Sequence, residues 1–199
     1  MKHLHPNGWH RVIYSRDVNE LLPTVRSKCV DFLSLCNSQG MDVVIASTYV
    51  DHEAQAKLYA RGRTIPNTRI VTHDPPLWSW ANWRCAFTVV PIWFGRPLSE
   101  HAVDLDEIEF WHRIGESGEA VGLEWGGRWD EEKRRFAHFQ FTFGFSLEQV
   151  NAGQPLPETL QGPISDFTYR GTVRHAFGIA FKMALLRARQ WVWGLRAWQ

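Results

Sequence analysis

Apolar residues follow helical or strand-like spacing along most of this chain, and the spacing changes at glycines, prolines and acidic residues. Residues 17–39 place apolar side chains three and four positions apart and stop before Gly40, which predicts a helix. The run 42–48 is short and rich in valine and isoleucine, which predicts a buried strand. Asp51 is typical of a helix N-cap, so a second helix is predicted from there to Gly62.

The pattern continues with a loop, two strands and a third helix. Proline, asparagine and threonine predict a loop over 66–76, and the apolar run 86–92 predicts a second strand. Residues 106–121 carry apolar side chains along one helical side. The glycines at 126–127 then predict a turn into a strand over 136–143. This mixed order predicts a small α+β domain with helices packed on an antiparallel sheet.

Composition agrees with one compact domain. The chain has 199 residues, of which 44% are hydrophobic and 14% aromatic, and this is enough to bury a sizeable core. The first residues carry no apolar segment typical of a signal peptide, so we expect synthesis in the cytoplasm. Cys29 and Cys36 share one face of the first predicted helix, and Cys85 precedes a strand. All three cysteines fit packing better than disulfide or metal roles.

Charge divides the chain near its C-terminus. Every charged residue after Asp166 is basic, six in all, which leaves 16 basic and 21 acidic residues up to that point. Within the basic segment a polar residue recurs at every seventh position, between large apolar side chains: His175, Lys182, Arg189 and Arg196. This pattern predicts a basic amphipathic helix.

Two interpretations of the predicted C-terminal helix stay open. Its apolar runs are shorter than the roughly 20 residues that span a bilayer. Basic residues beside tryptophans are typical of a helix that lies in an anionic membrane surface, and here these residues are Lys182, Arg189, Arg196, Trp191 and Trp193. The helix fits equally well packing on the domain or on a partner protein.

The proline-containing and glycine-containing segment 149–162 predicts a linker between the domain and this tail. We therefore expect a domain over residues 1–157 and a linker with a basic helical tail over 158–199. No feature of the chain predicts binding to nucleic acid.

Three motifs together carry a resemblance to a known family. They are Ser47-Thr48-Tyr49 with Asp51, Gln55 and Gly62-Arg63-Thr64; the segment 79–88; and Trp125-Gly126-Gly127 followed by His138-Phe139-Gln140. Over residues 12–157 the chain resembles the zinc D-Ala-D-Ala carboxypeptidase and L-alanyl-D-glutamate endopeptidase family, which includes many phage endolysins. The resemblance implies the α+β fold that these peptidases share with hedgehog-like domains.

The resemblance also implies where catalytic groups would lie. A hydrolytic zinc site needs three protein ligands and an open position for water. The family's three ligand positions correspond here to Ala81, Thr88 and His138, so that only the last histidine is kept. Arg135 stands at the position of the general base, and Val50 at that of the arginine which stabilises the substrate oxygen. The resemblance thus implies a zinc peptidase scaffold with a degenerate active site and no zinc in this form.

The losses concentrate on catalytic positions while the surrounding motif residues are kept. Such concentration fits a natural pseudoenzyme or a deliberately inactivated form equally. A rerouted zinc site is the other alternative, using His73 with Asp74, or His101 with Asp104. The latter pair also fits the polar N-terminus of the following helix.

Several residues are candidates for a peptide-binding groove instead: Ser47, Gln55, Ser79, Arg84 and Trp125. Arg84 replaces a family glycine and is expected to enter the space left open there. With Arg135 it predicts a cationic cleft that attracts the carboxylates of a peptidoglycan stem peptide, although both arginines also fit solvated charges. Trp125 equally fits core packing.

The leading functional hypothesis is an endolysin-like domain that binds peptidoglycan, or a phage or envelope partner, without catalysis. It would act at the bacterial envelope or periplasm after phage-mediated release. The alternative is an active zinc L-Ala-D-Glu or D-Ala-D-Ala peptidase with rerouted ligands.

Overall fold

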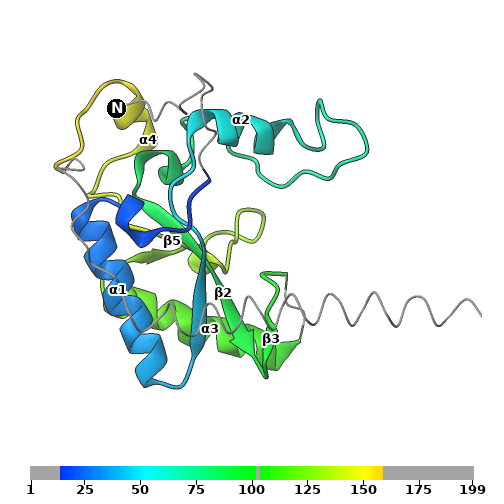
Figure 1. The fold of residues 1–199 in the computed structure, drawn as a ribbon, viewed down its shortest axis with the longest axis vertical. Helices are drawn as coiled ribbons and strands as arrows, with labels where there is room; N and C mark the ends of the chain where they lie inside the picture. Colours follow the sequence, from blue (N-terminus) through cyan, green and yellow to red (C-terminus); the bar gives the residue numbers. More distant parts are fainter. Residues whose placement is uncertain (1–13, 102–103, 159–199) are drawn as a thin grey trace, which may run out of the picture. The chain divides into compact units, whose positions relative to one another are not determined.

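The computed structural model describes residues 14–101 and 104–158. Within them the chain alternates helices with short strands, which Figure 1 colours along the sequence. The predicted tail, with Lys182, Arg189, Arg196, Trp191 and Trp193, lies outside the described residues, and its membrane role remains a prediction. In the described part, no helix is both long and apolar enough to cross a bilayer.

The sheet has five strands, all paired antiparallel, in the order β1-β2-β5-β4 with β3 added beside β2. Their bounds are β1 Asp42–Ser47, β2 Ala86–Trp93, β3 Arg96–Pro97, β4 Glu124–Trp125 and β5 His138–Gln140. The long strand β2 occupies the interior of the sheet, and its alternate residues Phe87 and Val89 are buried. These strands fix which side chains lie opposite one another at the candidate site.

Among the described residues, four α-helices accompany the sheet: α1 Pro23–Ser38, α2 His52–Ala60, α3 Leu105–Ala120 and α4 Leu147–Asn151. Short 3-10 turns lie at η1 Val18–Glu20, η2 Trp80–Trp83 and η3 Gly126–Arg128. Asp51 caps α2 by accepting a hydrogen bond from the Ala54 amide at 2.6 Å. Gly40 ends the turn after α1 at a φ of 73°, a conformation that favours glycine.

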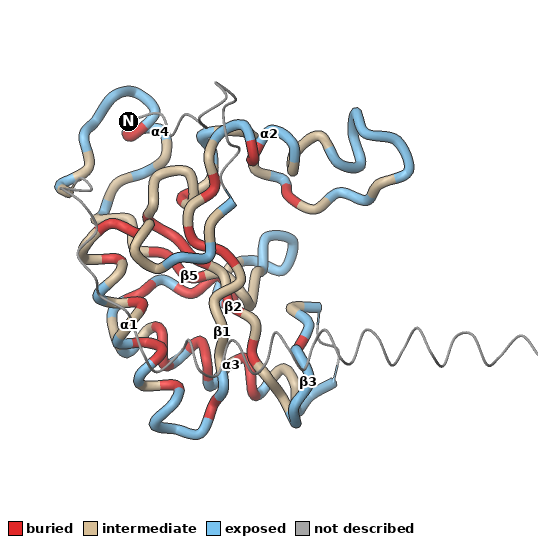
Figure 2. The backbone as a smooth tube through the Cα atoms, in the orientation of Figure 1, coloured by how far each residue is buried: buried red, intermediate tan, exposed pale blue. Residues whose placement is uncertain are grey.

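The core lies where α1 and α3 pack on one face of the sheet. Phe32 of α1 meets Phe139 of β5 with ring centroids 4.7 Å apart, and Phe87 of β2 stacks on Phe139 at 5.7 Å. Helix α3 approaches closely because Gly118 faces the Phe139 ring, which a Cβ at that position would overlap. Figure 2 shows the buried positions running along α1 and the central strands.

The α+β class with a small antiparallel sheet is confirmed, while several element bounds differ from the sequence prediction. The first helix begins at Pro23 rather than at residue 17, because proline fits the first turn of a helix and the preceding residues form η1. The strand predicted over 136–143 covers only His138–Gln140. Its end is followed by Phe143 and Gly144, both with positive φ, which turn the chain toward α4.

The predicted linker over 149–162 is wrong for its described part. Helix α4 extends to Asn151, and Leu156 packs against the core. Glu158 accepts hydrogen bonds from the backbone amide of Thr24, at 2.8 Å, and from the Thr24 hydroxyl. The carboxylate thereby satisfies the open N-terminus of α1, whose N-cap position holds a leucine, so this segment is part of the domain.

Candidate functional site

Three side chains form a row across neighbouring strands of the sheet, and we call Ser47, Thr88 and His138 the polar row. Ser47 of β1 pairs with Thr88 of β2, and Thr88 pairs with His138 of β5. The Ser47 and Thr88 hydroxyl oxygens lie 2.7 Å apart, in hydrogen-bond contact. Two of the three zinc-ligand positions named by the family resemblance therefore lie opposite each other, although one of them carries a hydroxyl.

His138 belongs to a chain of side-chain hydrogen bonds on the same face. Its Nε2 lies 2.9 Å from Oε1 of Gln140, and the Gln140 amide donates to Glu124 at 2.9 Å. The other Glu124 oxygen accepts from the indole nitrogen of Trp129, also at 2.9 Å. Because a carboxylate only accepts, the Gln140 amide must point its nitrogen at Glu124 and its oxygen at His138. This arrangement assigns the proton of neutral His138 to Nε2.

The His138 imidazole is neutral at pH 7. Burial lowers its pKa to about 4, and the positive charge of Arg135 acts in the same direction. The hydrogen bond with Gln140 and the charge of Glu124 oppose this shift and are weaker. Trp129 covers part of the ring, with centroids 5.1 Å apart. The neutral ring can thus donate from Nε2 and accept at Nδ1.

The lost histidine position, Ala81, lies in η2 and is tied to the chain that follows β1. Its carbonyl accepts from the Val50 amide at 3.3 Å, while the Asn82 side chain donates to the Val50 carbonyl at 2.8 Å. Val50 is only 4% exposed. Because its side chain is part of the interior, an arginine at this position would bury its charge.

Arg84 does not enter the space of the polar row, contrary to the sequence expectation. Its guanidinium forms an ion pair with Glu20, donates to the Glu20 carbonyl at 2.8 Å and lies 3.6 Å above the Tyr49 ring. The backbone of Arg84 has φ 63° and ψ 23°, the left-handed conformation. Glycine adopts this conformation more readily than other residues. The contacts with Glu20 and Tyr49 remove Arg84 from the expected cationic cleft.

The backbone of Arg135 contacts His138 of the polar row. Its carbonyl accepts from the His138 amide at 3.2 Å, and its own amide donates to Gly126 at 3.0 Å. Burial raises the pKa of Asp74, and the charge of Arg135 opposes that rise. The Asp74 backbone is held by the Gln55 side chain, which donates to its carbonyl at 2.7 Å. Arg135 is thus near enough to both Asp74 and His138 for its charge to act on them, which spacing along the chain does not indicate.

Of the remaining groove candidates, Ser79 is partly exposed, whereas Gln55 and Trp125 are buried. Gln55 is buried and fixes the loop at Asp74, and Ser79 precedes η2 with a partly exposed side chain. Trp125 is only 1% exposed, donates to the Phe136 carbonyl at 2.8 Å and packs against Gly115 and Gly127. Trp125 is therefore a core residue, as the alternative of core packing predicts.

The residues at the ligand positions do not fit a zinc ion. Ala81 has no donor atom, the Thr88 hydroxyl is bonded to Ser47, and Nε2 of His138 is bonded to Gln140. Over 14–101 and 104–158, no group of three His, Cys, Asp or Glu side chains is placed to share a metal. Asp104 accepts from the Asp106 amide at 2.9 Å as the N-cap of α3, and His73 and His101 are exposed.

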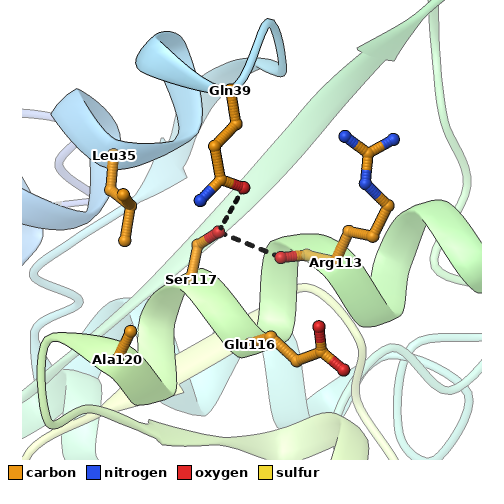
Figure 3. Close-up of a pocket in the computed structure, with 6 residues that line it drawn as sticks. All are labelled: Leu35, Gln39, Arg113, Glu116, Ser117 and Ala120. Carbon is orange, nitrogen blue, oxygen red and sulfur yellow. Dashed lines mark hydrogen bonds between the residues drawn. The ribbon is translucent and has the colours of Figure 1, made fainter.

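A shallow pocket of about 220 Å³ lies between α1 and α3, separate from the polar row. Figure 3 shows its lining, in which the Ser117 hydroxyl contacts Gln39 and the Arg113 carbonyl. Pockets that bind small molecules commonly exceed 300 Å³ and are mainly apolar. This pocket is smaller and half polar, and none of the candidate site residues lines it.

Comparison with protein-family models finds no match, and no curated protein matches the chain. Among solved structures, the chain is similar to the L-Ala D-Glu endopeptidase ChiX of Serratia marcescens, with a TM-score of 0.43 and 18% identity. The similarity covers 63% of this chain and 84% of that chain. A similarity this distant identifies neither an activity nor a site.

Proposed function

We propose that this chain is a peptidoglycan peptidase-like domain that binds a cell-wall peptide without hydrolysing it. One observation carries the proposal: Thr88 and His138 lie opposite each other at two family ligand positions, but the Thr88 hydroxyl and Nε2 of His138 are bonded to neighbouring side chains. This arrangement supports a site whose atoms form hydrogen bonds rather than metal bonds.

Hydrolysis by the family mechanism needs a metal-bound water and a base to take its proton. Here the base position holds Arg135, which cannot accept a proton at neutral pH, and the arginine position holds the buried Val50. The same groups remain able to bind a peptide. The Arg135 guanidinium is a donor that suits carboxylate and carbonyl oxygens, and Nδ1 of the neutral His138 ring can accept from a peptide N–H.

The test measures binding and hydrolysis separately on the full chain. Purified, protein-free peptidoglycan sacculi should retain the protein in a pelleting assay, and no new peptide termini should appear over the same incubation. A matched variant, His138→Ala, should weaken retention, whereas His52→Ala at the exposed first residue of α2 should not. Failure of the wild-type protein to pellet with sacculi would refute the proposal.

Zinc content separates this proposal from the alternative of an active peptidase with rerouted ligands. The proposal expects the purified protein to hold far less than one zinc per chain by elemental analysis. About one zinc per chain, together with release of stem peptides that a chelator stops, would establish the peptidase instead. The phage setting and the action at the envelope remain predictions.

A further inference from the structure

Arg135 is held rigidly beside the polar row by its backbone. Its amide and carbonyl bond to Gly126 and His138, as described above. The approach to Gly126 is close, because a Cβ there would stand 2.7 Å from the Arg135 carbonyl oxygen. The guanidinium stem therefore starts from a fixed point three residues before His138.

The charge of Arg135 has no ion-pair partner among the described residues, although the side chain is half-buried. Three other arginines are each paired with a glutamate: Arg84 with Glu20, Arg96 with Glu107, and Arg128 with Glu119. Removing a guanidinium partly from water without a counter-ion is unfavourable. A bound anion would supply the missing partner.

The surroundings suit the carboxylate of a peptide. The Trp129 ring and the Arg135 Cβ lie on the same side of Gly126, since a Cβ there would stand 3.2 and 3.3 Å from them, and the Trp129 ring in turn contacts the His138 ring. Two carboxylates lie near the site: Asp74, whose charge interacts with Arg135, and Glu124, which accepts from the Trp129 indole nitrogen at 2.9 Å. Neither is within ion-pair distance of Arg135. A guanidinium binds a carboxylate through two parallel hydrogen bonds.

We propose that Arg135 anchors a free carboxylate of the wall peptide at a site formed with His138 and Trp129. This inference rests on the proposed function and adds the chemical group that is recognised. It reverses the role that the family resemblance gives to this position, since a residue expected to accept a proton from water instead holds an anion. Asp74 opposes binding by its negative charge.

The experiment uses the full chain and a synthetic stem peptide that contains L-Ala-D-Glu, with its carboxylates either free or amidated. Isothermal titration should show the wild-type protein binding the free peptide about tenfold or more tightly than the amidated one, as expected for a charge-assisted hydrogen bond. Arg135→Gln should lose this preference. Arg134→Gln, the same charge change at the exposed neighbouring residue, should keep it.

A further variant tests whether removing a negative charge near Arg135 strengthens binding. Asp74→Asn should strengthen binding of the free peptide by a few fold and leave the amidated peptide unchanged, because one competing negative charge is removed. The effect should shrink in high salt.

The outcomes distinguish the two proposals. Wild-type protein that pellets with sacculi but binds free and amidated peptides equally would overturn the carboxylate site alone. Wild-type protein that binds neither sacculi nor peptide would overturn both. Should Arg135→Gln fail to fold, the comparison of the free and amidated peptides on the wild-type protein still tests whether a free carboxylate is recognised.

Discussion

The two faces of strands β2 and β5 use different interactions. On one face Phe87 and Phe139 stack beneath α1 and α3, and Gly118 lets α3 approach the Phe139 ring. On the other face Thr88 and His138 lie opposite each other within hydrogen-bonded side-chain networks. Apolar packing stabilises the first face, and hydrogen bonds between side chains connect residues of the second. A chain can therefore keep this fold while the chemistry of the second face changes.

The comparison predicts that the apolar face dominates stability. Phe139→Ala should lower the free energy of unfolding by about 3–5 kcal/mol, because it opens a cavity among Phe32, Phe87 and Gly118. Thr88→Val removes one hydroxyl at nearly constant volume and should cost about 1 kcal/mol, mainly by leaving the Ser47 hydroxyl without its partner. Urea denaturation of both variants gives the two values. Equal losses would mean that the polar row carries as much of the stability as the core.

A second prediction rebuilds the chemistry of the polar face. Ala81→His with Thr88→Asp should create a zinc site with His138, whereas the wild-type protein should take up no zinc. Zinc at 100 times its dissociation constant should then stabilise the double variant by about 2.7 kcal/mol. Val50→Arg is left out because its side chain would be buried.

Thermal denaturation with and without zinc measures this gain, and adding His138→Ala to the double variant provides the control. Zinc stabilisation that persists without His138 would show that the ligands lie elsewhere. No stabilisation of the double variant would show that η2 does not present position 81 to the polar row.

A third prediction uses the titration of His138. Its pKa is lowered to about 4 in the folded protein and is 6.5 in the unfolded chain, so the unfolded state binds the proton more readily between these values. The resulting stability is fully present above pH 6.5 and is lost as the pH falls toward 4. At pH 4.5 the loss should amount to about 2–3 kcal/mol.

His138→Gln keeps a donor for Gln140 but cannot take up the proton, so it serves as the matched variant. Its free energy of unfolding should fall less than that of the wild type between pH 7.5 and 4.5. Arg135 and Glu124 remain in both proteins, so their contributions are largely shared. Parallel curves for the two proteins would show that the ring is open to water.

Local sequence signals predicted the helices and long strands well. The Asp51 cap, the Gly40 stop and the helix predicted over 106–121 depend on neighbouring residues only, and the structure has them. Strand β5 was predicted too long, because the apolar run continues into Phe141 and Phe143 while the chain already turns. Such a turn depends on packing between segments that are distant in sequence.

The candidate site was less predictable, because its geometry depends on pairing across the sheet. Spacing along the chain does not reveal that Glu124 and Gln140 bond to each other, since this requires the register of β4 against β5. The direction of the Arg84 side chain likewise depends on Glu20, which lies in η1, and on Tyr49, which lies in the loop after β1. Long side chains at turns therefore need the structure before a role is assigned.

The smallest predicted effect concerns Arg84, where a family glycine position has become a long cation. The left-handed backbone favours glycine over alanine by about 1 kcal/mol, and neither substitute keeps the ion pair with Glu20 or the contact with Tyr49. Arg84→Gly should therefore be more stable than Arg84→Ala by about that amount in urea denaturation. Because the side chain points away from the polar row, both variants should bind sacculi as the wild type does. Alanine and glycine variants of equal stability would show that the backbone leaves this conformation once the guanidinium contacts are removed.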